Sequence, residues 1–136
     1  MKRLLRSNEG ATVTELAFIL PVVLLFLLGT MEVAHALGVW VTLTNEAREA
    51  ARYGVAGVRD GDSNISTEIQ TYAKDRLAGT LDITKLTITP TVVPVAGSTA
   101  GTVTVIEQYP LTFATPFMQQ LMGTVTVTGQ AVMRAE

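Results

Sequence analysis

The sequence predicts an α+β protein in which one long N-terminal helix, both transmembrane and amphipathic, packs on a small head with a three-stranded, mostly antiparallel sheet and short helices. Three observations predict this fold. An uncharged run fills residues 16–31, a helix-forming stretch follows it without a break, and three segments rich in valine, isoleucine and threonine lie in the second half. The 136 residues suffice for one such domain.

The composition excludes several classes of protein. The formal net charge is -2 and only 16% of residues are charged, so no basic surface for nucleic acid is expected. The chain has no cysteine, which removes disulfides, thiolate metal ligands and a cysteine nucleophile. Its one histidine, His35, is not accompanied by a Ser/His/Asp set or by a glycine loop that cradles phosphate. We therefore expect no enzyme, no cofactor and no metal site.

The N-terminal region has the pattern of a membrane span. Sixteen residues, 16–31, carry no charge, and extension back to Ala11 gives twenty-one residues, enough for a hydrocarbon core of about 30 Å. Glu32 is the only charged residue between this span and Glu46, whereas three cations precede it: Lys2, Arg3 and Arg6. This asymmetry predicts a cytoplasmic N-terminus, with the bulk of the chain on the other side of the membrane.

The helix is expected to continue well beyond the membrane. Apolar and small residues recur at spacings of three and four, at Trp40, Leu43, Ala47, Ala50 and Gly54. A helix over residues 12–53 would be about 60 Å long, twice what a bilayer needs, so its second half must stand in water or against the head. Gly54 is the expected C-cap. Pro21 removes one hydrogen bond within the span, which membrane helices tolerate.

A second interpretation of the N-terminal region is a secretory signal. The basic start, the apolar run and "AHA" at positions 34–36 form a cleavage pattern that would release a soluble protein beginning at Leu37. Cleavage after Ala36 would, however, cut the predicted helix in two. The alternative functions are therefore a secreted binding domain and, more remotely, an envelope enzyme.

The region after Gly54 reads as a turn-rich loop, "VAGVRDGDSNIS". Asp60, Asp62 and Asn64 match the first three ligand positions of a calcium loop. Ile65 stands where that loop needs its glycine, and position twelve is a threonine instead of the glutamate. A polar loop without calcium is the expected outcome.

A short amphipathic helix is predicted next. Thr67 and Gln70 form a capping box. An apolar stripe follows and ends before Gly79: Ile69, Tyr72, Ala73 and Leu77. Such a stripe is typical of a helix that packs on a sheet.

The three strands are expected at about residues 85–93, 102–109 and 124–134. Pro90 and Pro94 place the first at an edge of the sheet, and the last alternates so that one face is buried. Between the second and third strands, Thr115 caps a two-turn helix that starts at Pro116 and ends at Gly123. Four of its side chains are expected to pack inward: Phe117, Met118, Leu121 and Met122.

The N-terminal half resembles a known family. The basic leader, Gly10, a glutamate five residues later, the apolar helix interrupted by proline, and "NEAREAARYG" resemble the TadE-like pilus-assembly proteins of the tight-adherence machinery. The resemblance is strongest over residues 7–54, and "YPLTFATPFMQQLMG" with the final "MRAE" fits it more loosely.

The resemblance implies that a prepilin peptidase cuts between Gly10 and Ala11, so that Glu15 becomes the fifth residue of the mature chain. The chain then divides into a cytoplasmic leader (1–10), a long helix (11–54, with the span at 11–31) and an extracytoplasmic head (55–136). Many type IV pilins begin their mature chain with phenylalanine, whereas this one would begin with Ala11, so N-methylation stays open.

The family further implies a minor pilin or pseudopilin, similar to type IV pilins, that takes part in assembling a Tad-type adhesion pilus. Its partners would be other pilin subunits through the N-terminal helix, the prepilin peptidase and membrane lipid, with no nucleic acid. It would be a single-pass protein of the bacterial inner membrane that either stays there or enters the pilus.

Two roles remain open for Glu15. Cleavage would create an ammonium group at Ala11, and the carboxylate can pair with it, most usefully between neighbouring subunits, which would fix the axial register of the helices. The other role is a charge at headgroup level that is favoured by the helix dipole.

Overall fold

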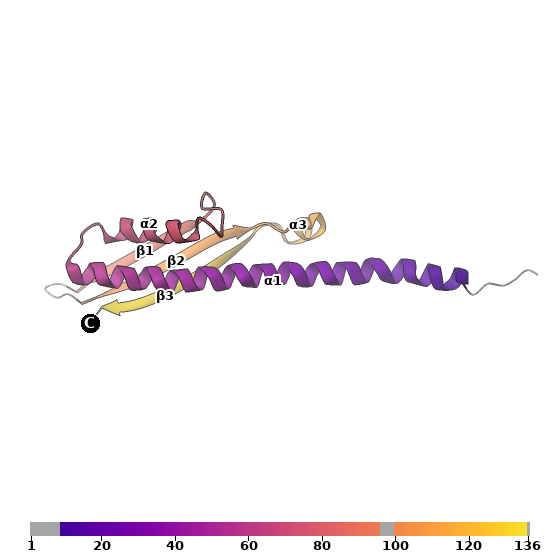
Figure 1. Ribbon diagram of the computed structural model, residues 1–136, viewed down its shortest axis with the longest axis horizontal. Coiled ribbons are helices and arrows are strands. Elements are labelled where there is room, and N and C mark those ends of the chain that lie inside the picture. The colour runs from indigo at the N-terminus through magenta and orange to yellow at the C-terminus, as the bar shows by residue number, and fades with distance from the viewer. Residues whose placement is uncertain (1–8, 96–99, 136) are drawn as a thin grey trace, which may run out of the picture.

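The computed structural model describes residues 9–95 and 100–135. Lys2, Arg3 and Arg6 lie outside them. The elements in chain order are α1 (Glu9–Asp60), α2 (Ile65–Leu77), β1 (Thr87–Pro94), β2 (Gly101–Leu111), α3 (Pro116–Met122) and β3 (Val125–Ala135). Figure 1 shows α1 as one long rod, with α2 and the sheet gathered along its C-terminal half. The predicted α+β fold is confirmed: a long apolar N-terminal helix, a three-stranded antiparallel sheet and short helices.

Helix α1 is longer than the sequence predicts. It spans 52 residues and contains Pro21, so its length is about 78 Å. The expected end at Gly54 is wrong, because α1 runs on to Asp60 and ends where Gly61 takes a left-handed φ of 75°. There the N–H of Asp62 donates to the Gly57 carbonyl at 3.0 Å, which closes the helix with a Schellman motif.

Gly54 has a packing role instead. A Cβ atom at this position would lie 2.6 Å from Cδ1 of Ile69 and 2.9 Å from Cγ1 of Val103. Glycine therefore lets α1 approach both α2 and β2 closely, and the residue marks an interhelical contact inside the head.

Helix α2 begins earlier than predicted, and the capping box is wrong. Asn64 is the N-cap and Thr67 lies inside the helix. The Asp62 carboxylate accepts a hydrogen bond from the Asn64 N–H at 2.8 Å, so part of the acidic loop organises the turn into α2. The apolar stripe is buried as expected at Ile69, Ala73 and Leu77, with Ile65 added. Tyr72 is half-buried and stacks on Tyr53 of α1, with 4.6 Å between ring centroids.

The sheet has the order β1-β2-β3, with antiparallel neighbours. Strand β1 is an edge strand, as its two prolines predict. The buried positions of β2 and β3 alternate with more exposed ones, so one face of the sheet is covered by helices. Helix α1 contacts all three strands and α2 contacts β1. The core lies in this layer, and its fully buried members on α1 are Leu43, Ala47, Ala50 and Ala51.

One contact brings the backbones of α1 and β3 unusually close. A Cβ atom on Gly129 would lie 2.5 Å from the carbonyl carbon of Leu43 and 2.7 Å from its oxygen. Since these are backbone atoms, no side-chain rotation would relieve the clash. Gly129 therefore sets how closely the sheet can pack on α1.

Helix α3 has the predicted limits but not the predicted packing. Thr115 is the N-cap, Pro116 starts the helix, and Gly123 ends it with φ 66°. The expectation that its apolar side chains pack inward is wrong for three of the four: Phe117, Leu121 and Met122 are 55%, 69% and 54% exposed. Figure 1 shows the reason, because α3 lies beyond the sheet, beside the bare half of α1.

We expect Gly129→Ala to destabilise the head by about 2 kcal/mol or more, as overpacking does in a close-packed core. The matched control is Gly79→Ala, where a Cβ atom would meet nothing within 4 Å. Urea unfolding of the detergent-solubilised protein, followed by the fluorescence of the single tryptophan, Trp40, measures both. Equal midpoints for the two variants would contradict the close contact.

Candidate assembly site on the N-terminal helix

The first half of α1 is apolar on every side and largely uncovered. Exposed apolar side chains follow one another along it, among them Leu16, Phe18, Ile19, Leu20, Val22, Val23, Leu24, Phe26 and Leu27. A helix that is hydrophobic all round lies in a protein core or a membrane, and this half has no core around it. Within the described part of the chain, α1 is the one helix long and apolar enough to cross a bilayer. The architecture is compatible with a single-pass membrane protein.

Gly10 and Ala11 lie in the first turn of α1 and are exposed. A Cβ atom on Gly10 would meet no atom of residues 9–95 or 100–135 within 4 Å, so packing among these residues does not require glycine there. The Thr14 hydroxyl donates to the Gly10 carbonyl at 2.8 Å.

Glu15 lies one helical turn from Ala11, and residues four apart share a face of the helix. Its side chain is exposed among apolar neighbours. Within the stretches that the structure describes, no hydrogen bond or ion pair reaches its carboxylate. The structure thus brings Gly10, Ala11 and Glu15 together at the free tip of α1, far from the head.

The sequence analysis did not predict the structural role of Glu32. It used this residue only as a charge that follows the membrane span. Glu32 is 4% exposed. Its Oε1 atom accepts a hydrogen bond from the backbone N–H of Thr115 at 2.8 Å. This bond ties the membrane-proximal part of α1 to the N-cap of α3. A partner 83 residues away leaves no local signal in the sequence.

Glu107 is a second residue that the sequence analysis missed. It is fully buried on the helix-facing side of β2, and neither carboxylate oxygen has a hydrogen-bond partner. Burial, with a smaller contribution from the charge of Glu46, raises the pKa of Glu107 to about 8. Glu46 itself pairs with Arg76 of α2, at 2.6 Å between Oε2 and Nε. The sequence did contain a signal for this burial, because Glu107 lies on the same face of the strand as Val103 and Val105.

Comparison with known proteins gives one match. Residues 10–52 match the family model described as TadE-like protein, and this confirms the resemblance inferred from the sequence. The matched segment lies wholly within α1 and includes Gly10, Ala11 and Glu15. No curated protein and no solved structure matches significantly. The match associates the chain with Tad pilus assembly.

We expect the head to lose stability as the pH rises from about 4.5 to about 8. The ordinary pKa of Glu107 is 4.5 and its folded value is about 8. Between them the folded chain holds a proton that the unfolded chain has released, so the free energy of unfolding falls with rising pH. At about 1.4 kcal/mol per pKa unit, the loss is a few kcal/mol.

Urea unfolding at pH 5.5 and 8.5 measures this loss. Glu107→Gln should remove most of the pH dependence, whatever its effect at one pH, whereas Asp75→Asn on the exposed face of α2 should keep it. Wild-type midpoints that do not change with pH would mean that the Glu107 carboxylate ionises normally.

Proposed function

We propose that this protein is a minor pilin or pseudopilin that takes part in assembling a Tad-type adhesion pilus. It does so as a single-pass subunit of the bacterial inner membrane after prepilin-peptidase cleavage following Gly10. The match of residues 10–52 to the TadE-like family carries this proposal. The matched segment lies on α1, and the head leaves most of the apolar half of this helix uncovered.

The processing step is supported by the geometry of the first turn of α1. Gly10 is exposed, and in the part of the chain that the structure describes nothing within 4 Å would oppose a side chain there. A glycine that packing does not require is consistent with a requirement imposed from outside, by a peptidase that needs a small residue beside the bond it cuts. Removal of residues 1–10 would leave the head unchanged, because the head meets α1 well beyond them: α3 lies beside Leu25 and Leu28, and the core begins at Val39.

Cleavage gives Glu15 a partner. The new ammonium group at Ala11 would sit in apolar surroundings at the end of a helix, where its charge is unfavourable next to the helix dipole. A lone charge at a helix centre costs about 2.5–3.5 kcal/mol on insertion scales. Pairing Glu15 of one subunit with Ala11 of its neighbour lowers this cost for both groups and favours one axial register.

The uncovered apolar half of α1 supports lipid and other pilin subunits as the partners. The uncovered apolar half offers lipid or the helices of other pilin subunits a surface without charges between residues 16 and 31. The positive residues that precede it and their scarcity after it support a cytoplasmic N-terminus and an extracytoplasmic head.

The alternative function, a secreted binding domain released after Ala36, is less well supported. Ala36 packs against the core and Val39 belongs to it. Cleavage after Ala36 would also remove Glu32, the hydrogen-bond acceptor for the Thr115 N–H. Cleavage after Ala36 would therefore remove residues of α1 that the head packs against and bonds to.

Glu15→Gln should preserve membrane insertion and cleavage yet reduce pilus assembly and co-purification with other pilins. The amide has nearly the size of the carboxylate without its charge, and a neutral group is cheaper to place in lipid. The Ala11 ammonium would then be buried unpaired wherever helices dock, at a cost of about 3–5 kcal/mol.

Electron microscopy of pili, recovery of partner pilins and the mass of the mature chain measure these effects. Asp75→Asn, the same kind of change on the exposed head, is the matched control and should behave as wild type. Normal pili and normal partner recovery in Glu15→Gln, with processing intact, would rule out the ion pair.

A further inference from the structure

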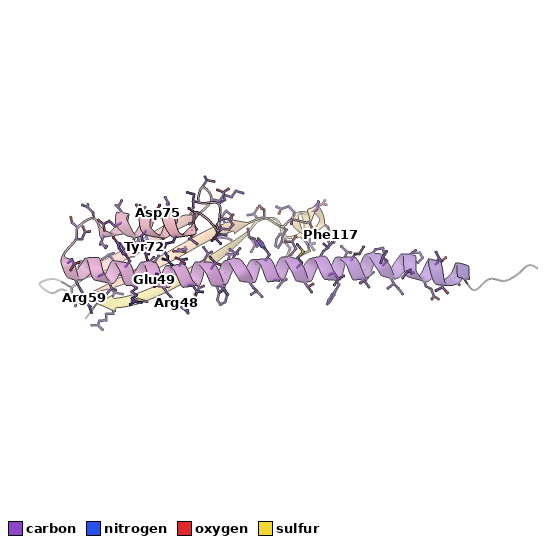
Figure 2. All side chains as sticks on the ribbon, in the orientation of Figure 1. Arg48, Glu49, Arg59, Tyr72, Asp75 and Phe117 are labelled. Carbon is purple, nitrogen blue, oxygen red and sulfur yellow. The ribbon has the colours of Figure 1, made fainter. Side chains whose placement is uncertain are left out.

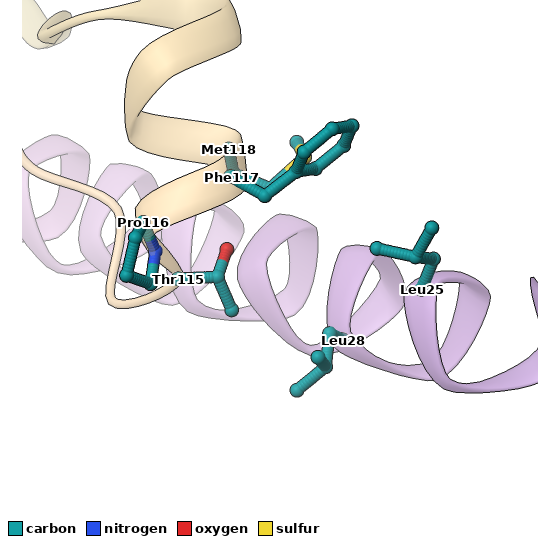
Figure 3. A pocket seen from close by; sticks show the side chains of 6 residues that line it. All are labelled: Leu25, Leu28, Thr115, Pro116, Phe117 and Met118. Atoms are coloured by element: carbon teal, nitrogen blue, oxygen red, sulfur yellow. The ribbon is translucent and has the colours of Figure 1, made fainter. Parts of the chain in front are cut away.

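Helix α3 lies beside the part of α1 that is predicted to be inside the bilayer. A groove of about 200 Å³ between them is lined by Leu25, Leu28, Thr115, Pro116, Phe117 and Met118 (Figure 3). Leu25 and Leu28 belong to the uncharged run of residues 16–31. If the span ends near Met31, they lie about 9 and 5 Å inside its outer boundary. A segment packed at that depth cannot stay clear of the lipid.

The surface that α3 turns outward is apolar. Phe117, Leu121 and Met122 are each more than half exposed. Figure 2 places Phe117 beside the bare half of α1, at the opposite end of the head from the labelled charged residues Arg48, Glu49, Arg59 and Asp75.

The surrounding sequence is free of charge over a long stretch. Residues 108–133 contain no aspartate, glutamate, lysine, arginine or histidine, and on α1 residues 33–45 contain only His35. The one carboxylate at this level, Glu32, is buried against Thr115. The segment of residues 108–133, which includes α3, therefore presents no acidic or strongly basic side chain. Exposed charges do lie on the loop before β1, at Asp82 and Lys85, and this loop meets α1 beside His35 and Gly38.

Several backbone N–H groups around α3 are bonded within the chain, which suits an apolar environment. The Phe113 N–H donates to Oε1 of Gln119 at 2.9 Å, and the Thr115 N–H donates to Glu32. At the other end of the helix, the Gly123 N–H donates to the Gln119 carbonyl at 2.9 Å.

We propose that α3 is a second membrane-contacting element, which lies in the outer leaflet with its exposed apolar face against lipid acyl chains. The inference rests on the part of the proposed function that places α1 across the membrane. A further groove of about 430 Å³ lies beside α3 along α1, next to Phe26 and Gly29. It is continuous with the surface that α1 gives to lipid, so acyl chains are the occupants that this surface fits.

This contact fixes the head relative to the bilayer. A single spanning helix can tilt and rotate, whereas α3 beside it in the same leaflet gives the chain a second point of contact. The head is then held with α3 toward the lipid, and the charged C-terminal end of α1 is held away from it.

Depth-dependent fluorescence quenching tests the proposal. Because the chain has no cysteine, single cysteines at Phe117, Phe26 and Lys74 can each carry one NBD fluorophore in the full-length protein. Proteoliposomes of phosphatidylethanolamine and phosphatidylglycerol then receive lipids with a nitroxide at carbon 5 or carbon 12 of the acyl chain. Phe117→Cys should be quenched several-fold more strongly by the shallow nitroxide than Lys74→Cys on exposed α2.

Each other outcome is informative. Quenching at Phe26→Cys but not at Phe117→Cys would overturn the inference and leave the membrane anchor intact, whereas quenching at neither would overturn both. A third outcome is self-quenching at Phe117→Cys that grows with the protein-to-lipid ratio, without quenching by the nitroxides. It would overturn the inference, because the partner of α3 would then be a second copy of the chain and not lipid. Leu121→Cys repeats the test at a more exposed position and guards against a folding defect of Phe117→Cys.

Discussion

The packing of the sheet on the small-residue face of α1 is the contact on which the rest of the structure depends. Three strands expose one apolar face, which cannot be buried without a helix across it. Ala47, Ala50 and Gly54 let α1 come close to the sheet and to α2, and Gly129 does the same from β3. Because the core needs only the C-terminal half of α1, the head leaves most of the N-terminal half uncovered, apart from the part beside α3.

That division separates two functions on one helix. Gly10 and Glu15 lie about 50 and 42 Å along α1 from Leu43, the first fully buried residue. Processing and subunit docking can therefore proceed at the tip without disturbing the head. The region between them and the core is where α3 lies, and Glu32 keeps its carboxylate out of the apolar surface there by bonding to Thr115.

Local pattern in the sequence was enough for most of the elements and not for their contacts. The strands, α2 and the limits of α3 follow from periodicity and turn residues within a few positions. The predicted caps at Gly54 and Thr67 were wrong for a local reason. In sequence, a glycine that permits close packing resembles a C-cap, and a threonine inside a helix resembles an N-cap. The exposure of α3 and the burial of Glu32 depend on partners far along the chain. The burial of Glu107 could have been predicted, because it alternates in phase with Val103 and Val105. The roles proposed for Gly10, Ala11 and Glu15 come from the family resemblance, since they would involve a peptidase and a neighbouring subunit.

The N-terminal residue of the mature chain tests most directly whether α1 stays whole as both anchor and head support. Mass spectrometry of the protein from its native membrane is predicted to find Ala11, with the entire helix from that residue attached to the head. A mature chain that begins at Leu37 would contradict this account, because the membrane half of α1 would then be a signal peptide and the head a secreted domain.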